Sequence, residues 1–235
     1  MMEPGAWLVP GGPLFEASTW ILPVLLAVTL HEAAHGFAAW WLGDDTAYRL
    51  GRVSANPLRH VDPVGTVILP AALLITGASF LFGWAKPVPV DMRRLRHPRS
   101  GMVWVAAAGP GTNLVLALVS AMLLHTVNLL PEAGAGWVAY TLFHSINLNL
   151  VLAVFNLLPL PPLDGGRIAV GILPWSLARR LAALEKYGFV ILLGLIVALP
   201  LLGQQMHQNW DVLGRIIGPS VRSLSELVLS LTGVL

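Results

Sequence analysis

The sequence predicts an all-α polytopic membrane protein. Of its 235 residues, 56% are hydrophobic and only 11% are charged, whereas a soluble domain carries about 25% charged residues. Several apolar runs reach the roughly 20 residues that a helix needs to cross a bilayer. Basic residues cluster in loops beside these runs, as the positive-inside rule expects. We therefore expect about five to six transmembrane helices in one membrane-embedded domain, 1–235, with a core at about 18–170 and C-terminal helices at about 181–235.

The apolar runs define the order of the helices. The first run ends at Gly43-Asp44-Asp45, and the fourth leads into a proline-rich segment. The tail from Pro219 has apolar residues at helical spacing, which predicts an interfacial helix or a short final span. The apolar runs are 18–42, 64–82, 102–130, 137–158 and 187–202, and all but the second are predicted to span the membrane.

The second run decides the topology. The loops on either side of it, 46–63 and 83–100, carry three and five Lys/Arg residues, so both are expected in the cytoplasm. A full span at 64–82 would place one of them outside. A re-entrant hairpin that bends near Pro70 or Gly77 keeps both inside, and we favour it. Within these loops, 51–56 and 86–90 are expected to be strand-like and to offer an edge to an extended peptide.

Composition excludes several kinds of site. A net charge of +2 gives no basis for nucleic-acid binding. The absence of cysteine excludes disulfides, thiol catalysis and thiolate ligands. Any bound metal must therefore be held by His, Asp or Glu.

The first span contains three ionisable residues, in His31-Glu32-Ala33-Ala34-His35. Each charged residue in mid-span costs roughly 2.5–3.5 kcal/mol on insertion scales, so such residues usually meet one another, a metal or a water-filled cavity. Residues four apart share a helix face, so His31 and His35 can bind one ion. Glu32 lies beside the first ligand and can act on water, which is the H-E-x-x-H arrangement of zinc hydrolases.

A catalytic zinc usually takes three protein ligands, and Asp164 is the strongest candidate for the third. It follows an apolar helix whose end, 156–164, contains prolines that break the helical hydrogen bonds. Broken backbone at membrane depth is tolerated where it lines a cavity or is covered by protein. Gly165 permits the tight turn that directs the carboxylate inward.

Together these segments resemble the site-2 proteases, the intramembrane zinc metalloproteases of peptidase family M50. The resemblance runs from His31 to about Arg167 and leaves no segment for a PDZ or CBS domain, which implies a compact form consisting of a single membrane-embedded protease domain. Beside the pentad and the segment 156–165, it rests on Asn56-Pro57, His60-Val61-Asp62-Pro63-Val64-Gly65-Thr66, Lys86-Pro87-Val88-Pro89-Val90 and Ala108-Gly109-Pro110-Gly111-Thr112-Asn113.

The resemblance implies a role for each residue. One Zn²⁺ per chain would be bound by His31, His35 and Asp164, with Glu32 as the general base and Asn156 at the scissile region or the oxyanion. It also implies a transmembrane protein substrate, a lipid bilayer around the enzyme and a multi-pass location in a plasma membrane, which we expect to be prokaryotic. Residues expected to support the ligands or contact the substrate are Asn113, His60, Pro161 and Gly165.

Two other interpretations stay open. The same His/Asp cluster could pass a cation in a membrane metal-ion transporter or channel, but a transporter does not require a base such as Glu32 beside its ligand. A catalytically silent relative that binds membrane proteins is a third class, and the complete motif argues against it. Asn113 could also simply pack helices through its small neighbours, and His60 could be an ordinary residue of a polar loop.

Overall fold

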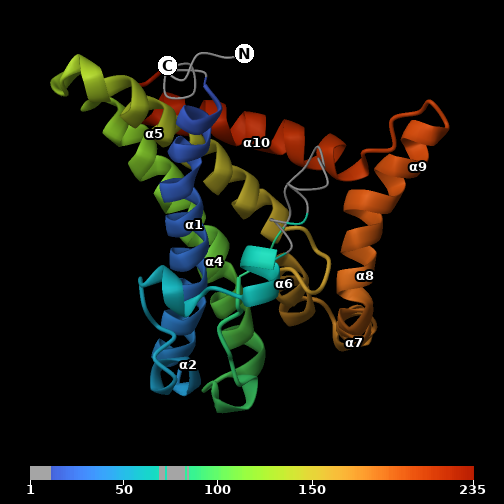
Figure 1. Cartoon of the computed structure of the whole chain (residues 1–235). Coiled ribbons are helices and arrows are strands. Elements are labelled where there is room, and N and C mark those ends of the chain that lie inside the picture. The colour runs from blue at the N-terminus through green and yellow to red at the C-terminus, as the bar shows by residue number, and fades with distance from the viewer. Residues whose placement is uncertain (1–11, 69–71, 73–82, 84) are drawn as a thin grey trace.

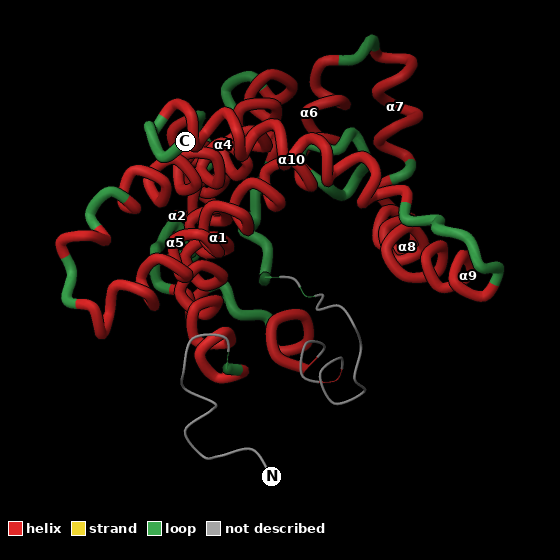
Figure 2. Tube along the Cα trace, turned by 90° about the horizontal axis from the view of Figure 1, so that it is seen from above, coloured by secondary structure: helices red, strands yellow, loops and turns green. Residues whose placement is uncertain are grey.

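The computed structural model describes residues 12–68, 72, 83 and 85–235. These residues form helices and loops and no strand (Figure 2). Four helical segments in the described part are long and apolar enough to cross a membrane: Leu14–Trp41, Pro98–Leu124, Glu132–Asn156 and Trp175–Gln205. The prediction of an all-α polytopic protein is therefore confirmed, and four spans lie in the described part where the sequence suggested five to six.

Three long helices lie side by side and form the body of the molecule (Figure 1). They are α1 (Pro13–Trp41), α4 (Pro98–Leu124) and α5 (Glu132–Asn156). α1 and α4 both begin with proline, whose fixed φ and missing N–H suit the first helical turn. α4 ends six residues before the predicted limit of 130 because the chain turns at His125 into the short 3₁₀ helix η4 (Val127–Leu129).

The turn after α1 joins the two basic loops. Gly43 has φ +113°, a conformation that glycine adopts without steric cost. The next residue, Asp44, is fully buried, and its carboxylate accepts hydrogen bonds from the N–H groups of Thr46 (3.0 Å) and Asp91 (2.6 Å). The short helices of these loops are α2 (Thr46–Arg49), η1 (Pro57–Arg59) and η3 (Met92–Arg94), and the π-helix η2 (Pro63–Ile68) follows the first loop at the start of the second apolar run.

The predicted strand-like segments are not strands. Segment 86–90 has no regular secondary structure, and Pro87 and Pro89 have no N–H to donate to a ladder. Segment 51–56 consists of turns and bends. Most of the run 64–82 lies outside the described residues, so the hairpin stays a prediction. Its flanks nevertheless lie together, as a hairpin requires, because Lys86 N–H donates to the carbonyl of His60 (2.9 Å).

Prolines end α5 and set the direction of the chain that follows. After Asn156 the segment 157–163 has no helical ladder, and α6 (Asp164–Ile172) begins directly behind it. The Arg99 side chain of α4 donates to the carbonyls of Gly171 and Leu173, so it closes the C-terminal end of α6. The chain then forms an arm apart from the main body (Figure 1): α7 (Trp175–Ala183), η5 (Glu185–Tyr187), α8 (Gly188–Leu193), the π-helix η6 (Gly194–Ala198) and α9 (Leu199–Gln205).

The last helix, α10 (Val212–Leu231), returns from this arm and crosses α4 and α5 (Figure 1). Asp211 caps it by accepting a hydrogen bond from Gly214 N–H (2.7 Å). Val228 of α10 is buried in a core cluster with Ala117, Ala121, Ile146 and Leu150. The tail is thus an amphipathic helix lying on the bundle, and it begins seven residues before the predicted position.

Candidate metal centre

Two helices bring three ligand atoms together. His31 and His35 lie one turn apart on α1, and their Nε2 atoms are 3.1 Å apart. Asp164 is the first residue of α6, and its Oδ2 lies 3.2 Å from His31 Nε2 and 3.3 Å from His35 Nε2. All three side chains are largely buried. The structure therefore places the three residues that the sequence singled out as ligands around one point.

This arrangement fits a zinc ion. Ligand atoms about 2.0–2.2 Å from zinc at tetrahedral angles lie roughly 3.3–3.6 Å from one another, close to the separations found here. Asp164 Oδ2 is buried and has no hydrogen-bond partner among the described residues. Opposite the ligands, a Cβ added to Gly109 of α4 would lie 2.5 Å from His35 Nε2 and 2.6 Å from His31 Nε2. A glycine thus keeps the space in front of both imidazoles open.

The far side of each imidazole is held by a hydrogen bond. His31 Nδ1 donates to Asn113 Oδ1 (2.6 Å), and His35 Nδ1 donates to the carbonyl of Val105 (2.7 Å). A proton on Nδ1 leaves the lone pair of Nε2 directed at the ligand cluster, as metal-binding histidines require. Asn113 is itself fully buried, and its amide donates to Asn149 Oδ1 of α5 (2.8 Å). It therefore contacts a proposed ligand directly and links α1, α4 and α5.

The Asp164 carboxyl is held in its ionised form. Burial alone raises the pKa of this group, but when the imidazoles of His31 and His35 also carry a proton on Nε2, their contacts outweigh burial and lower the pKa to about 2. A carboxylate at neutral pH is the form that binds a metal ion.

Glu32 lies beside the ligands and faces a cavity of about 550 Å³. Its Oε2 accepts a hydrogen bond from Val88 N–H (2.8 Å). His31 and Asn156 line the same cavity, and the other described lining residues are apolar: Val28, Gly83, Ala85, Leu152, Phe155, Pro162, Leu163, Phe189 and Leu192. The cavity thus lies between α1, α5 and α8, with an ionisable side and an apolar side.

Asn156 is at the last turn of α5, where its Nδ2 donates to the carbonyl of Leu152 (3.0 Å). An amide nitrogen has two N–H bonds, so this bond orients the group and uses only one of them. Pro161 and Gly165 do not line the cavity. A Cβ on Gly165 would collide with the carbonyl of Leu157, so this glycine lets α6 start against the end of α5.

His60 lies among the loops and is not brought to the ligands. Its side chain is buried, and its Nε2 is 2.9 Å from the carbonyl of Ser54. Sequence reasoning did not single out Val88 and Val105, because each contributes a backbone group that carries no signal in the residue type. Gly109 was quoted only as part of a motif, although a glycine among helix-forming residues is itself a signal of close approach.

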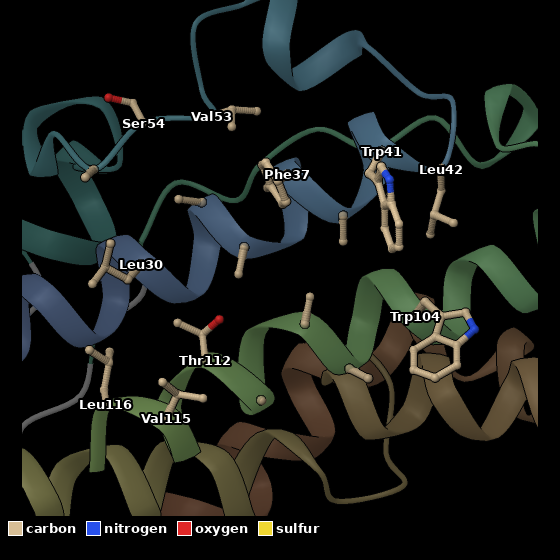
Figure 3. Close-up of a pocket in the computed structure, with 17 residues that line it drawn as sticks. Leu30, Phe37, Trp41, Leu42, Val53, Ser54, Trp104, Thr112, Val115 and Leu116 are labelled. Carbon is tan, nitrogen blue, oxygen red and sulfur yellow. The ribbon is translucent and has the colours of Figure 1, made fainter. Parts of the chain in front are cut away.

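A larger hollow lies on another face of α1 (Figure 3). This groove between α1 and α4 has a volume of about 1280 Å³, and none of its described lining residues is ionisable. Aromatic side chains, including Phe37, Trp41 and Trp104, flank it, and alanines form much of its surface. The smaller cavity at Glu32 is therefore the candidate site.

The sequence matches the model of peptidase family M50 over residues 19–201. A protein of Bacillus subtilis (strain 168), "Putative zinc metalloprotease YwhC", is 40% identical over 75% of this chain and 79% of its own length. "Putative zinc metalloprotease Rip2" of Mycolicibacterium smegmatis is 31% identical, and that of Mycobacterium tuberculosis (strain H37Rv) is 30% identical; each match covers 79% of this chain and 70% of the relative. No solved structure matches significantly.

Proposed function

Because the chain belongs to peptidase family M50, we propose that it is a zinc-dependent endopeptidase that cleaves membrane proteins within or beside their transmembrane segments. One observation carries the proposal: three atoms that can hold a metal lie together, and one of their residues, His31, lines the same cavity as Glu32, the carboxylate that can act as a base, beside helices of membrane-spanning length. The names of the relatives support a zinc metalloprotease.

His31, His35 and Asp164 would hold one zinc ion per chain. When bound, zinc supplies a Lewis acid toward the scissile carbonyl and makes water acidic enough to attack near neutral pH. Glu32 takes a proton from the attacking water on a carboxylate oxygen and then returns it to the nitrogen of the leaving amine. The Val88 N–H holds Glu32 Oε2 while this occurs.

The residues that line the cavity indicate which kind of substrate it accepts. A transmembrane helix keeps its peptide bonds in backbone hydrogen bonds, so it must unwind locally before Glu32 can act. The apolar side of the cavity, including Phe155, Phe189 and Leu192, suits the side chains of such a segment. Asn156 would donate its second N–H to the charge that develops on the scissile oxygen. Gly or Pro near the scissile bond should therefore favour cleavage.

The setting is a membrane. Four candidate spans and the family make the chain a multi-pass membrane protein with bacterial relatives, and we place it in the plasma membrane of a prokaryote. The alternative of a metal-ion transporter is not favoured, because the family is one of peptidases and because Glu32 has no required role in ion passage.

The test is cleavage of single-span reporter helices that carry a Gly-Pro pair at successive depths. Purified zinc-loaded protein should cleave at least one reporter, and Glu32→Gln should lower kcat by about 10²–10⁴-fold, the contribution typical of a general base. Zinc content, measured by mass spectrometry, should stay unchanged in this variant. If no reporter is cleaved, or if Glu32→Gln cleaves as fast as the parent protein, the proposed function is wrong.

A further inference from the structure

Arg52 is a buried arginine without a carboxylate partner in the described part of the chain. Its exposed fraction is 9%. The guanidinium donates instead to two backbone carbonyls, that of Lys86 (2.6 Å from Nη2) and that of Pro87 (3.5 Å). A buried charge is costly unless it is paired or fully hydrogen-bonded, so a cation kept here needs a reason.

The two carbonyls belong to the segment that holds Glu32. In Pro87-Val88-Pro89 only Val88 has a backbone N–H, because proline has none. That N–H donates to Glu32 Oε2 (2.8 Å). Arg52 therefore binds the carbonyls of Lys86 and Pro87. These are the two residues directly before Val88, whose N–H is the only backbone donor in the tripeptide.

The segment also rests directly on α1. A Cβ added to Gly36, one turn after Glu32, would lie 3.1 Å from Val88 Cγ1 and 3.1 Å from Val53 Cγ2. Val53 follows Arg52 in the loop that runs along α1 (Figure 3). The other backbone group of Lys86 is held as well, since its N–H donates to the His60 carbonyl (2.9 Å).

We propose that Arg52 is a positioning residue for Glu32: it fixes the Lys86–Val88 backbone so that Val88 N–H holds one carboxylate oxygen and the other is directed at the reacting water. This inference rests on the proposed function, in which Glu32 is the base. Arg52 acts on the rate of the proton transfer and neither binds the metal nor touches the substrate. Loss of Arg52 should therefore lower kcat and leave KM and zinc content unchanged.

The absence of cysteine allows a readout that is independent of activity. Val88 is 8% exposed and keeps its backbone N–H when it is changed to cysteine. In a Val88→Cys background, Arg52→Met should raise the rate of labelling by a small maleimide about tenfold or more. Arg52→Lys, which keeps the charge and a donor, should give an intermediate rate. The matched control is Arg59→Met, because Arg59 is exposed and bonds to the carbonyl of Gly51 instead.

In the chain with Val88 intact, Arg52→Met should lower kcat on a cleaved reporter by about 10–100-fold, the range typical of residues that orient a catalytic group. KM should stay within about twofold, zinc content and Tm should be unchanged, and Arg52→Lys should recover part of kcat. Arg59→Met should leave all four quantities at the parent values.

Several outcomes would overturn the inference. One is an unchanged labelling rate when Arg52→Met is added to Val88→Cys, and another is faster labelling with an unchanged kcat. A third is loss of zinc, or a Tm lower by several degrees, in the Arg52→Met protein. This third outcome would show that Arg52 has only a structural role. If Arg52→Met does not fold, the same measurements are made on Arg52→Lys. A labelling rate and a kcat equal to those of the protein with Arg52 would then reject the positioning role. Labelling tests the contact even if no reporter is cleaved, so the proposed function can fail separately.

Discussion

Gly109 sets how closely α4 can approach the two histidines. We expect Gly109→Ala to lower zinc affinity at least about tenfold, because the new methyl group would lie 2.5 and 2.6 Å from the imidazole nitrogens. Zinc titration in detergent measures the effect. Gly111→Ala is the matched control, since a Cβ there has nothing within 4 Å. Equal zinc affinity in the two variants would show that the imidazoles do not depend on this space.

At the same scale, the candidate ligands could be predicted from sequence and their supports could not. His31, Glu32 and His35 are recognisable because ionisable residues are rare in an apolar span. Asp164 is recognisable by the prolines before it. The groups that hold Glu32 and His35 are a backbone N–H and a backbone carbonyl, from Val88 and Val105. Any residue supplies a carbonyl and almost any an N–H, so only the fold shows which one is used.

At the scale of elements, α10 joins the arm to the bundle through one buried face. We expect Val228→Asp to destabilise the protein by on the order of 3 kcal/mol, because a carboxylate would be buried among Ala117, Ala121 and Leu150 without a partner. Leu231→Asp is the control on the same helix, since Leu231 is exposed. Thermal unfolding in detergent should show a lower Tm for the first variant only. A similar loss in both would mean that this face is not what docks α10.

The sequence predicted where helices end more reliably than it predicted how the loop segments form hydrogen bonds. The proline cluster correctly ended α5 near Asn156. By contrast, 51–56 and 86–90 were predicted to be strand-like, and neither segment is a strand. The structure uses the side chain of Arg52 and the carboxylate of Glu32, instead of a neighbouring strand, to satisfy the backbone of Lys86–Val88.

At the scale of the whole molecule, the basic loops lie at one end, which predicts that they face the same compartment. Arg94 pairs with Asp45 (2.8 Å), and Arg96 N–H donates to the carbonyl of Leu42 (3.0 Å), so the loop 83–100 is fastened to the turn after α1, where the loop 46–63 begins. The positive-inside rule predicts that this end lies in the cytoplasm. The opposite end, with η4 between α4 and α5, would then lie outside.

Two matched cysteines test this orientation. Leu50 near α2 is 62% exposed and Leu129 of η4 is 83% exposed. In bacterial spheroplasts, a membrane-impermeant maleimide should label Leu129→Cys at once and Leu50→Cys only after permeabilisation. The native chain has no cysteine and serves as the blank. The reverse pattern, or labelling of both before permeabilisation, would contradict the orientation.

The two halves of the proposed metal centre lie far apart in the sequence, so the ribosome makes them at different times. Asp164 follows His35 by 129 residues. At a synthesis rate of about 5–20 residues per second, α6 is made roughly 6 to 26 seconds after α1. During that interval α1 can already be in the bilayer, beside other newly inserted proteins, with only two of its three ligands. With the proposed ligand set, the metal centre can therefore be complete only after most of the chain has been made.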